Sequence, residues 1–180
     1  AEALASAGDF PGAVARFRPL AESTDPKLDP NIHDRAGLGM ARALAKQGDA
    51  ASASKTFDAL LGRTTDEAKA ADLLLEKAKA VEASGKLDEA LAAYKQVETR
   101  APKRDAALFA ALARSRLLAK DEPGEAADVL GRLLDGDDAR DRLKAINQPV
   151  DALLAERGWD LVDAGKLDDA DKVFADLLAE

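Results

Sequence analysis

The sequence predicts an all-α fold, a right-handed α-solenoid built from antiparallel helix hairpins. Apolar residues make up 47 % of the 180-residue chain and are mostly alanine and leucine, while aromatic residues make up only 4 %. Alanine and leucine have high helix propensity, whereas a β-protein needs more Val, Ile, Thr and aromatic side chains. A short pattern of small and apolar residues also recurs along the chain. Such repetition indicates hairpins that bury their apolar faces by stacking on their neighbours.

The recurring pattern is a glycine followed at fixed spacing by a small, an aromatic and an apolar residue. In its clearest copy these positions are Gly85, Leu87, Ala90, Tyr94 and Val97, with Pro102 five residues later. Gly85 can take the left-handed conformation that ends a helix. Ala90, Tyr94 and Val97 are spaced to share one face of the next helix, and Pro102 marks the region beyond its end.

Four other copies of the pattern align with this one. Three of them begin at Gly8, Gly48 and Gly165, and a weaker one has Asp121 at the glycine position. The small-residue anchors are Ala13, Ala53, Ala90, Ala126 and Ala170, spaced 40, 37, 36 and 44 residues apart. We expect each anchor to be buried where one helix approaches another closely, with the bulky residue four positions later filling the remaining space.

The pattern predicts the helices in order. We expect them over 1–7, 10–21, 32–46, 50–61, 66–83, 87–99, 104–119, 123–134, 149–164 and 167–179. Residues 22–30 are rich in Pro and Asp and read as a linker, and 135–148 read as an insert with a short helix at 139–146. Pro149 fits the first turn of the following helix, and a kinked continuous helix is the alternative. We expect a single array over 1–180, with about 4.5 hairpins of about 40 residues each.

The order of Gly, Ala, aromatic and Pro residues resembles the tetratricopeptide repeat, whose unit has about 34 residues. The resemblance covers nearly the whole chain. It is strong around 85–102 and 154–177 and weak around 104–133, and the longer spacings depart from the family pattern. It implies a scaffold or adaptor, without catalysis, that holds a segment of a protein or peptide partner in a concave groove.

The resemblance also implies which residues face that groove, since the first helix of each hairpin lines it in this family. The partner-binding residues would be Arg35, Leu38, Arg42, Asp72, Leu75, Lys79, Glu82 and Trp159, with Leu108, Ala111 and Ser115 in the weak repeat. Arg35, Arg42 and Lys79 would form a basic strip suited to an acidic segment, or simply a solvated face. Trp159 would anchor a partner or cover the end of the array.

Composition excludes several other classes of function. The net charge of −8 disfavours nucleic acids and anionic membrane surfaces, which attract basic proteins. No apolar run is long enough to cross a membrane. The chain has no cysteine, which removes disulfides, thiolate catalysis and cysteine-based zinc sites. Glycine-rich phosphate loops are absent too, and we expect close helix packing at Gly37 and Gly39. We therefore predict a non-enzyme without cofactor.

Two candidate metal or catalytic features are weak. The single histidine, His33, cannot form a histidine cluster, and we expect an ordinary surface residue. The acidic tract comprises Asp135, Asp137, Asp138 and Asp141. A calcium loop that begins at Asp135 needs Gly at its sixth and Glu at its twelfth position, where Arg140 and Ile146 stand. We therefore expect no metal site.

Composition also suggests where the protein acts. Abundant alanine and acidic residues, together with the absence of cysteine, suit a bacterial envelope protein. We expect a periplasmic or cell-envelope location, as in exopolysaccharide secretion or outer-membrane assembly, with the cytoplasm as the alternative. The chain starts within an expected helix, which we interpret as a segment of a longer protein. Two alternative functions stay open: a sensor segment of a larger enzyme or transcription regulator, and an array that self-assembles into homo-oligomers through its ends.

Overall fold

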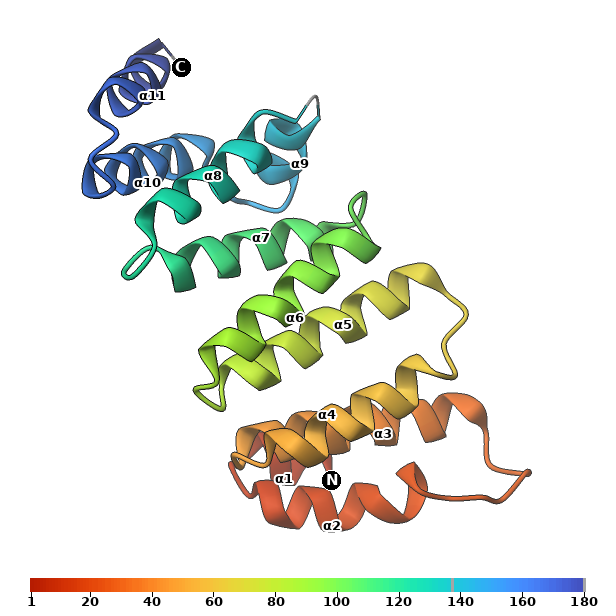
Figure 1. The fold of residues 1–180 in the computed structure, drawn as a ribbon. Helices are drawn as coiled ribbons and strands as arrows, with labels where there is room; N and C mark the ends of the chain where they lie inside the picture. The colour runs from red at the N-terminus through yellow and green to blue at the C-terminus, as the bar shows by residue number, and fades with distance from the viewer. Residues whose placement is uncertain (137, 180) are drawn as a thin grey trace. The chain divides into compact units, whose positions relative to one another are not determined.

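The computed structural model describes residues 1–136 and 138–179, and this part of the chain folds into consecutive helices (Figure 1). They are α1 (Glu2–Ser6), α2 (Phe10–Ala21), α3 (Pro30–Lys46), α4 (Ala50–Leu61), α5 (Glu67–Glu82), α6 (Leu87–Arg100), α7 (Asp105–Leu118), α8 (Pro123–Leu134), α9 (Ala139–Ala145), α10 (Val150–Asp163) and α11 (Leu167–Ala179). The predicted all-α class, an α-solenoid of helix hairpins, is confirmed.

The chain divides into two compact units, which we call unit 1 (Ala1–Ala93) and unit 2 (Tyr94–Glu180). The division falls within α6, and each unit is described by itself below. In unit 1, α3 packs against both α2 and α4, and α4 packs against α5. In unit 2, α8 packs against both α7 and α10, and α10 packs against α11. The single array over 1–180 stays a prediction.

Aspartate side chains start several helices in unit 1. Asp9, Asp29 and Asp49 each accept a hydrogen bond from a backbone N–H in the first turn of α2, α3 and α4, at 2.8–3.0 Å. Asp66 accepts two such bonds at the start of α5. Each cap satisfies a backbone donor that the helix leaves unpaired, typically worth about 1 kcal/mol. The cap at Asp29 lets α3 begin at Pro30, two residues before the predicted start.

Four glycines form the predicted left-handed turns. The φ angles of Gly8, Gly48, Gly85 and Gly165 lie between 72° and 90°. The weak copy behaves differently, because Asp121 is not among the described residues with positive φ. There the Glu122 N–H donates to the carbonyl of Leu118 at 2.7 Å before α8 begins.

The small-residue anchors are all buried, as the repeat predicts. Ala13, Ala53, Ala90, Ala126 and Ala170 are at most 1 % exposed. The bulky residues four positions later are also buried at Phe57, Tyr94 and Leu130. These alanines therefore lie on the buried faces of their helices, where neighbouring elements pack.

Two glycines within α3 of unit 1, and one within α10 of unit 2, let side chains of neighbouring helices pack closely against the backbone. A Cβ atom at Gly39 would lie under 3.0 Å from the ring of Phe17, and one at Gly158 would lie equally close to Phe174. At Gly37 it would meet Leu60 at 3.0 Å. The prediction that Gly37 and Gly39 serve helix packing is confirmed.

The insert in unit 2 holds a short helix, α9, close to its predicted bounds. Asn147 follows with a φ of 57°, so α9 and α10 are separate helices and the kinked alternative is wrong. Pro149 lies at the N-cap, one residue before the first turn that the sequence predicts for it. Of the acidic tract, Asp137 lies outside the described residues.

Candidate partner-binding surface

One face of α3 forms the centre of a surface in unit 1. Arg35, Leu38 and Arg42 lie three and four residues apart, so a helix places them on the same side. They line a cavity of about 440 Å³ together with residues of α1 and α2. They also line a second cavity of about 300 Å³ on the side of α5, where Asp72, Leu73 and Glu76 complete the wall. The structure thus brings together four of the predicted groove residues: Arg35, Leu38, Arg42 and Asp72.

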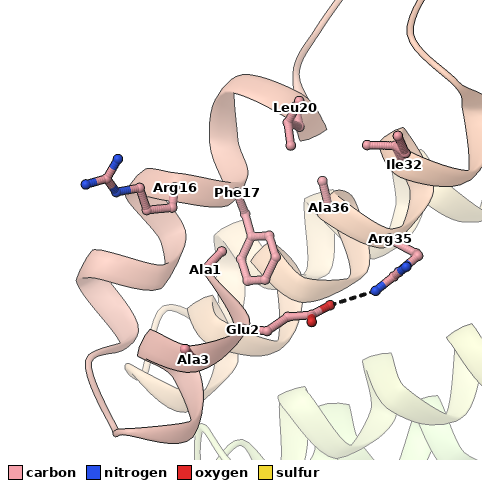
Figure 2. Close-up of a pocket in the computed structure, with 9 residues that line it drawn as sticks. All are labelled: Ala1, Glu2, Ala3, Arg16, Phe17, Leu20, Ile32, Arg35 and Ala36. Atoms are coloured by element: carbon pink, nitrogen blue, oxygen red, sulfur yellow. Dashed lines mark hydrogen bonds and ion pairs between the residues drawn. The ribbon is translucent and has the colours of Figure 1, made fainter.

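A third cavity of about 530 Å³ lies at the beginning of unit 1 (Figure 2). Its apolar wall comes from Phe17 and Leu20 of α2 and from Ile32 and Ala36 of α3. Leu20 and Ile32 are 41 % and 47 % exposed, so two large apolar side chains are accessible at this cavity. Figure 2 shows these two side chains pointing toward one another. This apolar opening adjoins the α3 face described above.

The charges on the α3 face correct the predicted basic strip. Arg35 pairs with Glu2 at 3.0 Å, and Arg42 pairs with Glu76 at 2.9 Å. Lys79 also contacts Glu76, at 3.5 Å. All three cations therefore face carboxylates. For the two arginines, the acids come from other helices, which sequence spacing does not reveal, whereas Lys79 and Glu76 lie three residues apart on α5. The surface is of mixed charge around an apolar floor.

The remaining predicted residues of α5 differ in their exposure. Lys79 and Glu82 are exposed, as a groove residue should be. Leu75 is only 7 % exposed and does not line either cavity, so its predicted place on the accessible surface is wrong. The physical reason is that α5 buries the consecutive residues Leu73, Leu74 and Leu75, and three consecutive positions span most of a helix circumference.

The weak repeat in unit 2 buries most of the surface of its predicted groove residues, although Leu108 and Ala111 line a cavity of about 450 Å³ together with residues of α8 and α9. Leu108, Ala111 and Ser115 are at most 6 % exposed, and the Ser115 hydroxyl donates to the carbonyl of Leu112 at 3.0 Å. The insert helix α9 lies beside α7, where Arg142 approaches Asp105 at 3.7 Å. Ser115 is therefore buried instead of facing a groove, whereas the partner-binding role of Leu108 and Ala111 stays a prediction.

Trp159 on α10 is 62 % exposed. Its ring meets that of Phe174 edge to face, with centroids 5.4 Å apart. The exposure means that Trp159 is not a core residue, although Phe174 supports one side of it. Such an amphipathic ring on a supported helix is the kind of side chain that anchors protein interfaces.

Asp160 is a residue that the sequence reasoning missed. It is 7 % exposed, and its Oδ2 atom is buried without a hydrogen-bond partner. Burial raises the pKa of Asp160 to about 6, and the nearby carboxylates of Glu156 and Asp163 contribute to the rise. The feature that accounts for buried residues on two sides of α10 is structural: this helix packs against both α8 and α11.

His33 is also more than an ordinary surface residue. Its ring is partly buried, and its Nε2 atom lies 2.9 Å from the carbonyl of Ala21. Nη1 of Arg63 lies 3.0 Å from Nδ1. If Nε2 carries the proton, it donates to Ala21 and Nδ1 accepts from Arg63. The ring thereby connects α3 to the end of α2 across the linker.

Two further features bear on the class of protein. Within residues 1–136 and 138–179, the structure has no group of three or more His, Asp or Glu side chains placed to hold a metal ion. In the same part of the chain, none of the helices has the length and hydropathy needed for a membrane span.

Comparison with known families decides the identity of the first part of the chain. A family model described as tetratricopeptide repeat matches residues 4–80. Residues 4–80 are tetratricopeptide repeats. Repeats of this family generally mediate protein–protein interaction, and their fold is typically a non-catalytic scaffold. A search of curated proteins finds no match.

Two solved structures resemble the whole chain in fold. Both are of a Podosopora anserina protein described as a kinesin light chain with nearly identical TPR-like repeats, and one of them is a variant. Each is 17 % identical to this chain and covers 99 % of it, with TM-scores of 0.64 and 0.65. The alignments cover 89 % and 90 % of those chains. At this identity the likeness shows the shared tetratricopeptide-type fold.

Proposed function

We propose that this tetratricopeptide-repeat chain is a non-catalytic scaffold that binds a segment of a protein partner on the α3 face of unit 1. The observation that carries the proposal is that Arg35, Leu38 and Arg42 line two cavities at once. A segment that crosses Leu38 would place side chains in both cavities. A surface built on packed helices is preorganised, which reduces the ordering cost of binding.

The charges around Leu38 suit a segment that carries both apolar and charged side chains. Arg42 and Glu76 are paired across the opening, and the Arg42 side chain is 56 % exposed. An incoming carboxylate can take the place of Glu76 on Arg42 without leaving a buried charge alone. The apolar floor would supply affinity, and the rim would select the register of the segment.

Selection from a displayed peptide library, followed by calorimetry, tests this proposal. Peptides selected on the wild-type chain should bind at least tenfold more weakly to Leu38→Asp, which places a charge on the apolar floor. Arg42→Glu should weaken them as well, whereas Lys55→Glu makes the same charge change on the exposed side of α4. Selected peptides that bind all three variants as well as wild type would contradict the proposed site.

We further propose that the scaffold acts in a bacterial envelope assembly or exopolysaccharide-secretion system. The alanine-rich, acidic and cysteine-free composition supports this placement. Fractionation of the source cells, with the complete gene product tagged, should recover it from the envelope or periplasm. Recovery from the cytoplasm alone would reject the placement and favour the alternative of a sensor segment in a larger enzyme or regulator.

Self-assembly is a second candidate because large apolar side chains are exposed in both units. Leu20 and Ile32 line the opening in unit 1, and Trp159, Leu167 and Leu178 are exposed in unit 2. Sedimentation velocity over a concentration series distinguishes the two candidates. A mass that stays monomeric at high concentration would support the adaptor and reject the self-assembling array.

A further inference from the structure

One stripe of α10 in unit 2 combines an exposed tryptophan with three carboxylates. Glu156, Trp159, Asp160 and Asp163 occur at spacings of three and four residues. At about 100° per residue they fall within an arc of about 100° on the helix. Trp159 lies at one edge of the arc and Asp160 at the other, with Glu156 and Asp163 between them. We call these four residues the α10 stripe.

The buried carboxylate of the stripe, Asp160, has an oxygen atom without a hydrogen-bond partner in the part of the chain that the structure describes. Asp160 is 7 % exposed, and its Oδ2 atom has no hydrogen-bond partner among the described residues. Burial raises its pKa, and the negative charges of Glu156 and Asp163 raise it further. A buried carboxylate normally has a cation or hydrogen-bond donor beside it, since an unpaired one is costly.

Some other carboxylates of unit 2 do have such partners. Glu98 holds Arg114 at 2.7 Å, and Asp128 lies 3.7 Å from Lys166. Arg157, the only cation within α10, is directed to Asp135 at 3.6 Å. Within residues 1–136 and 138–179, no Lys or Arg comes within ion-pair distance of the carboxylates of the α10 stripe. The carboxylates of the α10 stripe are therefore not neutralised by a Lys or Arg of the described residues.

The chemistry of the stripe indicates which kind of cation fits. The described residues offer no cluster arranged for a metal ion, so an organic cation is favoured. Trp159 is 62 % exposed, and guanidinium groups stack on the faces of such rings while their N–H groups donate to carboxylates alongside. The edge contact with Phe174 supports the Trp159 ring.

We propose that the α10 stripe binds a basic segment of a protein partner through an arginine side chain. The guanidinium stacks on Trp159, and its N–H groups donate to the carboxylates of Glu156 and Asp163. The positive charge also compensates the buried Asp160. This inference rests on the proposed scaffold function, because it assumes that the chain binds a protein partner. It adds that unit 2 binds part of that partner and that this part is basic.

The experiment uses Trp159, which is the only tryptophan of the chain. Its fluorescence is followed while an end-blocked ten-residue peptide of alternating Ala and Arg is added to the whole chain. We expect a saturable change in emission. A matched Ala/Glu peptide should cause none, and an Ala/Lys peptide should bind several-fold more weakly because ammonium stacks less well. Equal affinity for the Lys peptide would overturn the arginine assignment.

Paired charge variants separate the stripe from the overall acidity of the protein. Glu156→Gln with Asp163→Asn should weaken binding of the Arg peptide about tenfold or more. Asp121→Asn with Glu122→Gln removes the same charge from exposed positions of unit 2 and should leave the affinity unchanged. Equal weakening by both pairs would assign binding to net charge and overturn the proposal.

The remaining outcomes distinguish this inference from the proposed function. A peptide that fails to change the emission, or an acidic peptide that binds instead, would overturn the inference. The scaffold proposal would still stand if library peptides bind unit 1 and lose affinity in Leu38→Asp. Calorimetry with Trp159→Ala provides an independent check, since this variant should weaken the Arg peptide without altering the helical circular-dichroism signal.

Discussion

Arg114 and Glu98 form a bidentate ion pair inside unit 2, with Nε–Oε1 at 2.7 Å and Nη2–Oε2 at 2.9 Å. The Arg114 side chain is only 6 % exposed, and Glu125 lies 3.4 Å from its Nη1 atom. The hydrogen bonds that Arg114 donates to Glu98 raise the pKa of Arg114 above its usual value, so the guanidinium stays charged within the helix stack. The pair connects α6 to α7 across the weak repeat.

Removal of Glu98 should therefore destabilise the protein strongly. Glu98→Ala leaves a buried guanidinium with only the longer contact to Glu125, and we expect a loss of about 2–4 kcal/mol in the free energy of unfolding. Urea titration followed by circular dichroism measures this loss. Glu89→Ala on the same helix breaks an exposed pair with Lys86 and should cost only about 0.5 kcal/mol. Similar losses in the two variants would contradict the buried role of the pair.

The close approach of α2 to α3 should make Gly39 sensitive to substitution. In Gly39→Ala the new methyl group meets the buried ring of Phe17, and we expect destabilisation by about 1–2 kcal/mol. At Gly124 an added Cβ meets its nearest neighbours at an ordinary 3.6 Å. Gly124→Ala should therefore stabilise α8 by about 0.5–1 kcal/mol through helix propensity. Thermal unfolding of both variants shows whether the signs are opposite.

The anchor alanines should not tolerate larger side chains. Ala53 is fully buried on α4, so Ala53→Leu overpacks the contact between helices and should cost about 1–3 kcal/mol. Ala59 is exposed on the same helix, and Ala59→Leu should change stability by less than about 0.5 kcal/mol. The midpoint of urea unfolding measures both. An unchanged midpoint for Ala53→Leu would show that this position does not seat neighbouring helices.

Asp160 should make the stability of unit 2 depend on pH. Its pKa is about 6 in the folded protein and about 3.8 when unfolded, so the folded state binds the proton more tightly. The stabilisation from this proton is full below about pH 4 and is lost as the pH rises through about 6. Asp160→Asn should remove this dependence and raise stability at pH 7.5 by roughly 1–3 kcal/mol.

Unfolding free energies of wild type and Asp160→Asn at pH 7.5 and pH 5.0 test this prediction. The difference between the two proteins should shrink at the lower pH, because the wild-type carboxyl then begins to be protonated. Carboxylates that do not interact with Asp160 cancel in the comparison. A difference that is independent of pH would contradict the raised pKa.

Local sequence signals predict the helices within two residues of their bounds. Gly48 and Gly85 end helices through the backbone conformation that glycine favours, and Ala53 and Ala90 mark the buried face of the next helix. These signals act between residues close in the chain, where spacing alone fixes which side chains share a face. The same reasoning predicts the short helix of the insert.

The surface was less predictable because it depends on neighbours that are distant in sequence. Glu2 and Glu76 lie 33 and 34 residues from the arginines that they pair with. The resemblance to the tetratricopeptide repeat assigns Leu75 and Ser115 to the groove, but it does not tell which helices cover these two residues. The repeat pattern does not predict the burial of Asp160 for the same reason, since α10 packs against other helices on more than one side.

At the four turn glycines, the backbone conformation disfavours every L-amino acid that carries a side chain. Gly8, Gly48, Gly85 and Gly165 have open space where a side chain would project, since an added Cβ would meet nothing within 4 Å. What excludes other L-residues there is handedness of the backbone, and not lack of room. A mirror-image residue such as D-alanine prefers the very region that these turns occupy. Chemical synthesis with D-alanine at these positions should therefore raise the free energy of unfolding, because it reduces the conformational entropy of the unfolded chain.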